Sequence, residues 1–235
     1  NGNGSITSSV SANTTAGFSI VSYTGTGSTA TVGHGLSVAP EFLVVKNRTT
    51  GTTAWQCGSD YLPHATPWSR YITLSSGAAE TNSTQMWNDT APTSSVFTIK
   101  DAGDVNTNTN NYIAYCFHSV EGYSKVGSFT GNNDAANNTF VYTGFKPAFL
   151  LVKNITTAGQ YWTIWDNKRD PYNMSNHILE PNDSRVESNV SNNTSVDLLS
   201  NGFKPKNNNN QCGGGPTLFL YYAVASSPFK TSNAR

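Results

Sequence analysis

The stretch Pro40-Glu41-Phe42-Leu43-Val44-Val45-Lys46-Asn47 returns 107 positions later as Pro147-Ala148-Phe149-Leu150-Leu151-Val152-Lys153-Asn154. Short apolar runs of β-branched and aromatic residues, bounded by turn residues, are typical of strands that are buried on both faces. Proline is tolerated at the start of a strand, where its missing N–H is not needed for pairing. We interpret the two copies as the central strands of two related halves.

The repeat extends beyond these strands. Trp55 and Trp162 have the same offset of 107 positions, as do Tyr112–Phe117 and Phe219–Val224. Val96–Ile99 and Val196–Leu199 are only 100 positions apart, and the polar loop 204–215 recovers the difference. A duplicated fold accepts insertions and deletions in its loops while its strands keep their spacing.

These patterns predict an all-β fold of two tandem, internally repeated β-sandwich-like modules with long polar loops. We expect residues 1–16 to be a linker or N-terminal arm, residues 17–124 the first module and residues 125–235 the second. The two modules are expected to pack together and could form one domain. A short helix is expected at most within residues 176–189.

The composition excludes several classes of partner. Only 12% of the residues are charged, the formal net charge is zero and the pI is about 7.1. Nucleic-acid binding depends on clustered Lys and Arg, so it is not expected. Membrane insertion is not expected either, because no apolar run approaches the roughly 20 residues of a membrane helix. The first residue is Asn and residues 1–19 lack a signal peptide pattern, so we expect a fragment or a processed product.

The three cysteines are not expected to form disulfides. At the offset of 107 positions, Ile164 corresponds to Cys57 and Ala223 to Cys116. Positions that accept Ile or Ala are packing positions, so both thiols should be buried. Cys212 lies in the sequence Gln-Cys-Gly-Gly-Gly, where we expect an exposed loop.

The aromatic residues divide into shared and unshared positions. Trp55 and Trp162 recur in both halves and are expected to anchor the core. Trp68, Trp87 and Trp165 have no counterpart, and unshared aromatic rings are candidates for a surface that stacks on a sugar or fills a partner's pocket. Packing of the loops is the alternative for each. The candidate ligand-binding residues are Tyr61, Trp68, Trp87 and Trp165, together with the loop Asn132–Asn138.

No residue pattern indicates a metal, a cofactor or a catalytic centre. Asp104–Asn108 alternates oxygen side chains as calcium loops do, but Thr109 and Tyr115 stand where such a loop needs Gly and Glu. A turn in which Asn and Asp bond the nearby backbone is the alternative. The acidic residues Glu180, Asp183 and Glu187 are expected on a solvated surface. We expect no enzyme activity, no cofactor and no metal.

Several phrases resemble a domain of uncharacterised function that occurs in large structural proteins of tailed bacteriophages, many of them marine. They are Gly17–Gly25, Val32–Leu36, Pro40–Asn47, Tyr112–Gly131 and Ser227–Lys230. The resemblance covers roughly residues 17–235 and implies a virion component such as a tail fibre, an adhesin or a capsid appendage. That family has no established catalytic or binding residues to transfer.

Four functions follow as hypotheses. The first is a phage structural protein on tail or capsid that attaches to host-surface glycan, and it implies other virion proteins as partners. It also implies a homo-oligomer, with a trimer favoured, and a protein assembled in the bacterial cytoplasm and displayed on the virion. The second is a purely architectural decoration or cement protein of the capsid. A polysaccharide depolymerase and an extracellular glycoprotein with sugar on its Asn-x-Ser/Thr sites are the third and fourth.

Overall fold

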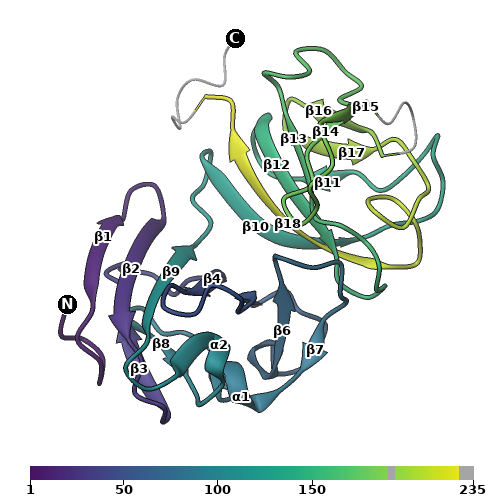
Figure 1. The fold of residues 1–235 in the computed structure, drawn as a ribbon. Helices are drawn as coiled ribbons and strands as arrows, with labels where there is room; N and C mark the ends of the chain where they lie inside the picture. The colour runs from purple at the N-terminus through teal and green to yellow at the C-terminus, as the bar shows by residue number, and fades with distance from the viewer. Residues whose placement is uncertain (190–193, 228–235) are drawn as a thin grey trace. The chain divides into compact units, whose positions relative to one another are not determined.

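The computed structural model describes residues 1–189 and 194–227, and it confirms the all-β prediction (Figure 1). The chain divides into two compact units, one of Asn1–Leu74 with Glu80–His118 and one of Ser75–Ala79 with Ser119–Arg235. The second predicted module extends to residue 235, so its residues 190–193 and 228–235 lie outside the described part. Among the described residues, no helix has the length and apolarity needed to cross a membrane.

The first unit is built on a seven-stranded antiparallel sheet in the order β1-β2-β9-β4-β5-β6-β7, with the pair β3-β8 beside it. Two single-turn α-helices and one 3-10 turn connect these strands. The elements are β1 (Ser9–Asn13), β2 (Phe18–Thr24), β3 (Ala30–Gly33), β4 (Phe42–Asn47), β5 (Trp55–Ser59), η1 (Pro67–Ser69), β6 (Arg70–Thr73), β7 (Thr81–Asn82), α1 (Thr84–Trp87), β8 (Val96–Ile99), α2 (Gly103–Asn106) and β9 (Asn111–Phe117).

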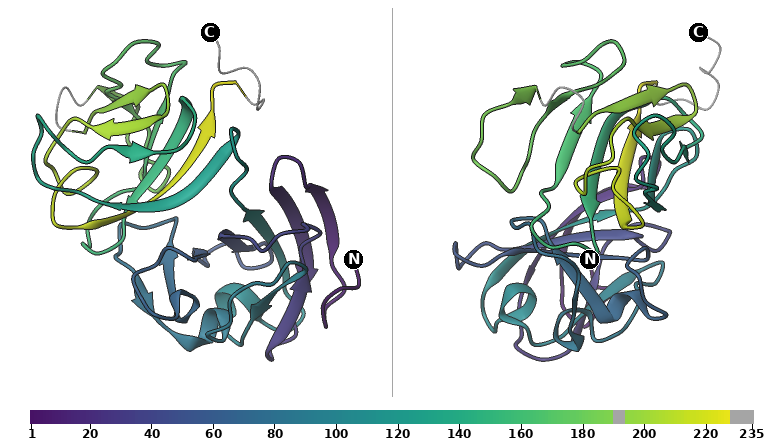
Figure 2. Two further views of the ribbon diagram at one scale, coloured as in Figure 1. Left: turned by 180° about the vertical axis from the view of Figure 1, so that it is seen from behind. Right: turned by 90° about the vertical axis from the view of Figure 1, so that its right-hand side faces the viewer.

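The second unit is built on the sheet β10-β18-β12-β13, with a three-stranded sheet β11-β17-β16 and the pair β14-β15. Figure 2 shows the strands of the four-stranded sheet running side by side. The elements are β10 (Ser124–Thr130), β11 (Val141–Tyr142), β12 (Pro147–Asn154), β13 (Thr163–Asp166), β14 (His177–Ile178), β15 (Ser188–Asn189), β16 (Val196–Leu199), β17 (Gly202–Pro205) and β18 (Leu218–Ala225).

The repeated stretches form the same strand in both units. Leu43 of β4 pairs with Cys116 on one side and with Gly58 on the other. Leu150 of β12 pairs in the same way with Ala223 and Trp165. All three pairs of positions keep the offset of 107 residues, so the duplication extends to the pairing register. Each unit has its own core of buried apolar side chains.

The N-terminal residues are part of the fold, so the prediction of a linker or arm over residues 1–16 is wrong. β1 pairs with β2 in the register Ser9↔Ser22 to Asn13↔Phe18. Ile6 is buried and forms a bridge to Val32, and the Ser8 hydroxyl donates to the Gly33 carbonyl at 2.8 Å. The free edge of β2 offers unpaired backbone groups, and a polar segment can satisfy them whatever its hydropathy.

The short helix expected within residues 176–189 is also wrong. His177–Ile178 and Ser188–Asn189 form the antiparallel pair β14-β15, and Leu179 bridges to Ile164 of β13. Pro181 lies between the two strands and lacks the N–H that a helix would need there. Backbone pairing with β13 therefore decides the conformation.

Cys57 and Cys116 are buried free thiols, as predicted, but the exposed position expected for Cys212 is wrong. Cys212 is fully buried in the core of the second unit. Its loop turns inward because the buried Asn138 amide donates to the carbonyls of Asn207 and Gly213 at 2.7 and 2.8 Å. Burial raises the pKa of the Cys212 thiol.

Candidate ligand-binding site

Three of the four candidate ligand-binding residues lie in the cores, so the prediction of a contact surface is wrong for them. The exposed fraction is 2% for Trp68, 0% for Trp87 and 0% for Trp165. The Trp68 and Trp87 rings meet edge to face with centroids 5.9 Å apart, and Trp165 Nε1 donates to the Thr194 carbonyl at 3.0 Å. The Trp87 N–H is buried without a partner among the described residues, and none of the three rings is available to a ligand.

One exchange between the units explains why these tryptophans are unshared. Gly58 and Trp165 occupy the same register position beside the repeated strands. A Cβ atom on Gly58 would lie 2.4 Å from a ring carbon of Trp68 and 2.9 Å from one of Trp87. In the first unit two indoles from outside the strand fill the volume above a glycine, whereas in the second unit the strand supplies the indole itself.

The fourth candidate, Tyr61, is half-buried and does not line the hollow described below. Its hydroxyl donates to Glu41 Oε1 at 3.0 Å. Burial and the nearby carboxylates of Glu41 and Asp60 raise the pKa of Tyr61 to about 12. The shared tryptophans behave differently from each other, since Trp162 is buried, whereas Trp55 is half-buried and stacks on Tyr115 at 6.3 Å.

The loop Asn132–Asn138 is exposed from residue 132 to residue 137, but its polar groups are used within the loop. The Asp134 carboxylate accepts from the backbone N–H groups of Ala136 and Asn137 at 2.9 and 3.0 Å. The Asn132 amide donates to the Asn137 carbonyl at 2.8 Å. The loop therefore holds its own shape and presents few unsatisfied groups.

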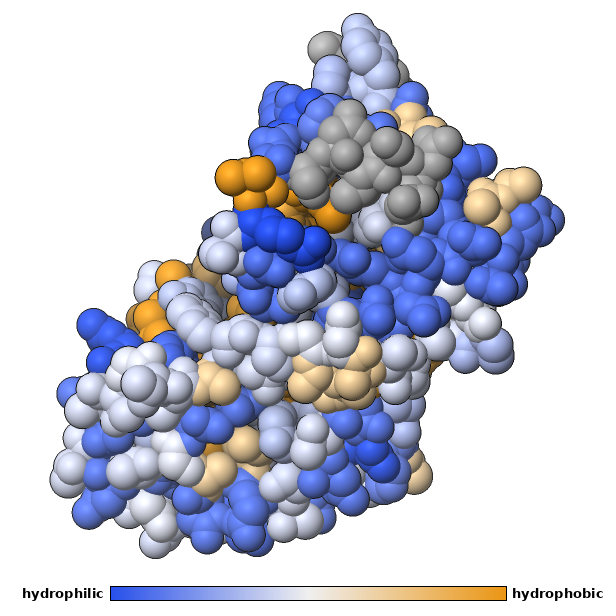
Figure 3. Space-filling view, turned by 45° about the vertical axis from the view of Figure 1, so that its right-hand side comes forward, coloured by the Kyte–Doolittle hydropathy of each residue, from blue (hydrophilic) through white to orange (hydrophobic). Residues whose placement is uncertain are grey.

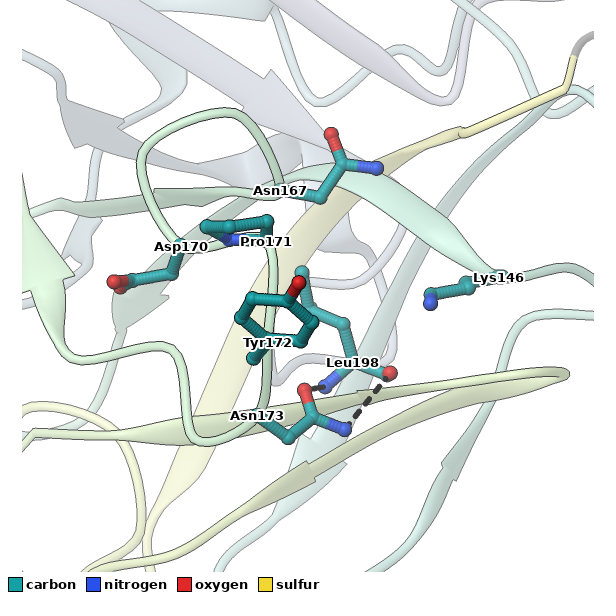
Figure 4. Close-up of a pocket in the computed structure, with 7 residues that line it drawn as sticks. All are labelled: Lys146, Asn167, Asp170, Pro171, Tyr172, Asn173 and Leu198. Carbon is teal, nitrogen blue, oxygen red and sulfur yellow. Dashed lines mark hydrogen bonds between the residues drawn. The ribbon is translucent and has the colours of Figure 1, made fainter.

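A hollow of about 230 Å³ lies on the second unit, in a region that sequence analysis did not single out (Figure 4). Tyr172 stands at its centre, and 84% of this side chain is exposed. Pro171 and Leu198 of β16 are the aliphatic residues of the lining. The residues around the hollow are Lys146, Asn167, Asp170, Pro171, Tyr172, Asn173 and Leu198.

The loop that carries Tyr172 is fixed by the polar residues on both sides of it. Asp170 Oδ2 accepts from the backbone N–H groups of Asn176 and His177 at 2.7 and 2.8 Å, and Oδ1 lies 2.6 Å from His177 Nδ1. The Asn173 amide pairs with the Leu198 backbone, as Figure 4 shows, with bonds of 3.2 and 2.9 Å. The ring is thus exposed on a loop that is already held in place.

Asp170 is ionised, but its carboxylate bonds the surrounding loop and does not point into the hollow. Burial opposes its ionisation, yet the hydrogen bonds from His177 and Asn176 outweigh burial and lower the pKa of Asp170. Figure 4 shows its carboxylate pointing away from the Tyr172 ring. The Lys146 ammonium, the Asn167 side-chain amide and the Tyr172 hydroxyl have no polar partner among the described residues. These three groups remain for a ligand.

The described residues form no cluster of metal-ligating side chains. Within residues 1–189 and 194–227, no three His, Cys, Asp or Glu side chains gather as metal ligands would. In the expected turn at Asp104–Asn108, the Asp104 carboxylate accepts from Gln56 Nε2 at 2.7 Å and the buried Asn106 amide donates to two carbonyls. Figure 3 shows a face covered mostly by hydrophilic and neutral residues, with small separate apolar areas.

Tyr172 could have been found from the sequence. Ala65 stands at the position 107 residues before it, so Tyr172 is an unshared aromatic residue. The predicted candidates include one tyrosine, Tyr61, but not Tyr172. The sequence Asp-Pro-Tyr-Asn places this tyrosine among turn residues, which usually lie at the surface.

The comparisons with known proteins give one match. The model of a family described as a domain of unknown function (DUF7483) matches residues 1–228, and the chain belongs to this family. No curated protein and no solved structure matches the chain.

Proposed function

We propose that this member of the DUF7483 family is a non-catalytic saccharide-binding protein, and that the hollow beside Tyr172 is its contact site. The observation that carries the proposal is a tyrosine ring that is 84% exposed on a loop held by Asp170 and Asn173. An exposed aromatic ring costs solvation free energy unless a ligand covers it, and a fixed loop lowers the entropy lost on binding.

The chemistry of the lining suits a sugar ring. A flat aromatic face packs against the apolar C–H face of a sugar, while amide and hydroxyl groups bond its hydroxyls. Tyr172 and Asn167 supply these two kinds of contact, and Leu198 adds an apolar surface. The volume of about 230 Å³ is below the roughly 300–1,000 Å³ typical of drug-sized ligands. A single sugar unit of a longer chain is therefore the expected occupant.

The lining favours binding over cleavage. Glycoside hydrolysis uses two carboxyl groups on opposite sides of the scissile bond. The lining has one carboxylate, Asp170, and both of its oxygens are engaged by the loop. A depolymerase would need a second acidic residue at this position.

The biological setting that we propose is attachment of a tailed phage to its bacterial host. Its basis is the resemblance of residues 17–235 to a domain of phage structural proteins, and the Asn/Thr/Ser-rich surface suits an exposed particle. In that setting the chain acts as part of the virion, with other virion proteins as partners. A homo-oligomer, with a trimer favoured, would multiply weak contacts to host-surface glycan by avidity.

A glycan array with bacterial envelope saccharides tests the proposal. Tyr172→Ala should lower the affinity at least about fivefold, because stacking on an aromatic ring is worth about 1–3 kcal/mol in related contacts, at about 1.4 kcal/mol per tenfold. Tyr142→Ala is the matched control, since Tyr142 of β11 is a tyrosine of the same unit, 60% exposed, that does not line the hollow. Equal loss in both variants, or no loss in Tyr172→Ala, would contradict the site.

The architectural alternative has a distinct outcome. A capsid decoration or cement protein would show no saccharide binding and would occupy regular positions on the capsid lattice in many copies. Electron microscopy of the native particle with a labelled chain separates this outcome from a few copies at the tail.

A further inference from the structure

We infer that the hollow beside Tyr172 selects an acidic saccharide, one that carries a carboxylate, over a neutral one. This inference rests on the proposed function and names the class of its ligand. It comes from the balance of charge and of hydrogen-bond donors around the hollow.

Lys146 supplies a positive charge that no residue of the described chain neutralises. Its side chain is exposed, lines the hollow and has no carboxylate within ion-pair distance among the described residues. Its backbone is held where β12 begins, because the Lys146 carbonyl accepts from the Ser226 N–H at 2.9 Å. The ammonium group therefore starts from a fixed point and stands across from Tyr172 in Figure 4.

The one acidic residue of the lining does not cancel this charge. Asp170 uses both oxygens on Asn176 and His177, and Figure 4 shows its carboxylate directed away from the space between Tyr172 and Lys146. Because Coulomb energies fall with distance, a carboxylate that points away from this space offsets the charge of Lys146 less than one that pointed into it would.

The groups without partners are also mostly donors. An ammonium group donates three hydrogen bonds and accepts none, a side-chain amide donates two and accepts about two, and a phenol donates one and can also accept. Lys146, Asn167 and Tyr172 carry these groups. An ionised carboxylate accepts about four hydrogen bonds and donates none, whereas a neutral sugar hydroxyl accepts about two and donates one. The carboxylate of an acidic sugar is the better complement.

A pair of matched saccharides tests the inference with the whole chain. Isothermal titration compares a polyuronate oligosaccharide with its carboxyl-reduced form, in which each carboxylate has become a neutral CH2OH group. We expect wild-type binding to the acid form to be about five- to tenfold tighter, as an exposed charge-assisted hydrogen bond predicts. Higher salt should weaken binding of the acid form alone.

Variants assign the preference to Lys146. Lys146→Gln should bring the affinity for the acid form down to that for the reduced form and leave the reduced form unaffected. Lys168→Gln is the matched control, because Lys168 is exposed on the same loop region but does not line the hollow. The preference should persist in this control.

The outcomes separate the two proposals. Equal affinity for both forms, with loss of both in Tyr172→Ala, would overturn the acidic preference and leave saccharide binding intact. A preference that survives Lys146→Gln would overturn the role of Lys146. Binding of neither form, nor of any array glycan, would overturn the proposed function itself.

Discussion

The two units fill the same place in their cores with tryptophans from different parts of the chain. In the first unit Gly58 leaves room above the sheet, and Trp68 of η1 and Trp87 of α1 enter that room. In the second unit Trp165 projects from β13 at the equivalent register position and fills the core directly. Duplicated strands can therefore keep their pairing although the large side chain comes from a strand in one unit and from connecting segments in the other. Close packing requires that the volume of the core is filled, but not that a particular part of the chain fills it.

The repeated lysines show a second difference. Lys46 is half-exposed and donates to carbonyls of its own loop, those of Gly51 and Thr53. Lys153 is fully buried and donates to the carbonyls of Asn154 and Gln160, both at 2.8 Å, and of Gly77 at 3.4 Å. Gly77 belongs to Ser75–Ala79, the segment that the second unit takes from the first half of the chain. The repeated lysine is thus half-exposed in the first unit and buried in the second, because the segment Ser75–Ala79 contacts Lys153.

Trp165→Ala should have the largest effect. Removal of a fully buried tryptophan leaves a cavity and costs about 3–5 kcal/mol of unfolding free energy. Hydrogen exchange of residues 147–154 should accelerate, while exchange of residues 42–47 in the other unit should change little. Trp87→Ala is the corresponding variant of the first unit. It should accelerate exchange of residues 42–47 and change exchange of residues 147–154 little. Equal acceleration of both strands in either variant would show that the units do not have separate cores.

Lys153→Met should change how stability depends on pH. Burial lowers the pKa of Lys153 to about 8, whereas a lysine in the unfolded chain titrates near 10.4. Between these values the unfolded chain holds a proton that the folded chain lacks, so wild-type stability should rise with pH relative to the variant. The rise should reach on the order of 3 kcal/mol, at about 1.4 kcal/mol per pKa unit.

Urea denaturation of wild type and Lys153→Met at pH 7, 8, 9 and 10 measures the difference. Burial raises the pKa values of the three thiols in the folded chain, whereas the thiols of the unfolded chain ionise near pH 8.5 in both proteins, so only the difference between the two curves is informative. Lys46→Met is the matched control at the repeated position. Parallel curves for wild type and Lys153→Met would contradict the prediction.

Gly58→Ala should destabilise the first unit by about 1–3 kcal/mol. The new methyl group would lie 2.4 Å from a Trp68 ring carbon, and a packed core has no room for it. Thermal unfolding measures the loss. The double variant with Trp68→Leu should lose less than the sum of the two single variants, because the smaller side chain relieves the overlap. Additive losses would mean that overlap with the Trp68 ring is not what destabilises Gly58→Ala.

Ser83→Ala should have the smallest effect, about 1 kcal/mol. The Ser83 hydroxyl accepts from the Gln85 N–H at 3.2 Å and caps α1, the helix that brings Trp87 into the core. Chemical denaturation compares it with Ser28→Ala, whose hydroxyl makes no such cap. A loss no greater than that of Ser28→Ala would show that packing of Trp87 alone positions α1.

Much of the fold could be predicted from the sequence, but less of the candidate site. Alternating and continuous apolar runs indicated the central strands, and the offset of 107 residues matched Cys57 and Cys116 with apolar residues and so indicated their burial. Residues 9–13 contain only Val10 and Ala12 as apolar residues, so their hydrophobic signal is weak, because an edge strand is held largely by its backbone. Cys212 was misplaced for a related reason, since the hydrogen bonds of a distant residue, Asn138, turn its loop inward.

The sequence by itself determined that this protein is an all-β duplication, because strand periodicity and a fixed offset are properties of the linear chain. Only the tertiary structure decided which aromatic residues are buried and which are exposed. Trp68, Trp87 and Trp165 fill two equivalent core positions, whereas Tyr172 stands exposed between Asp170 and Asn173. Burial depends on the contacts that long-range packing brings to a side chain, and neither residue type nor local sequence contains that information.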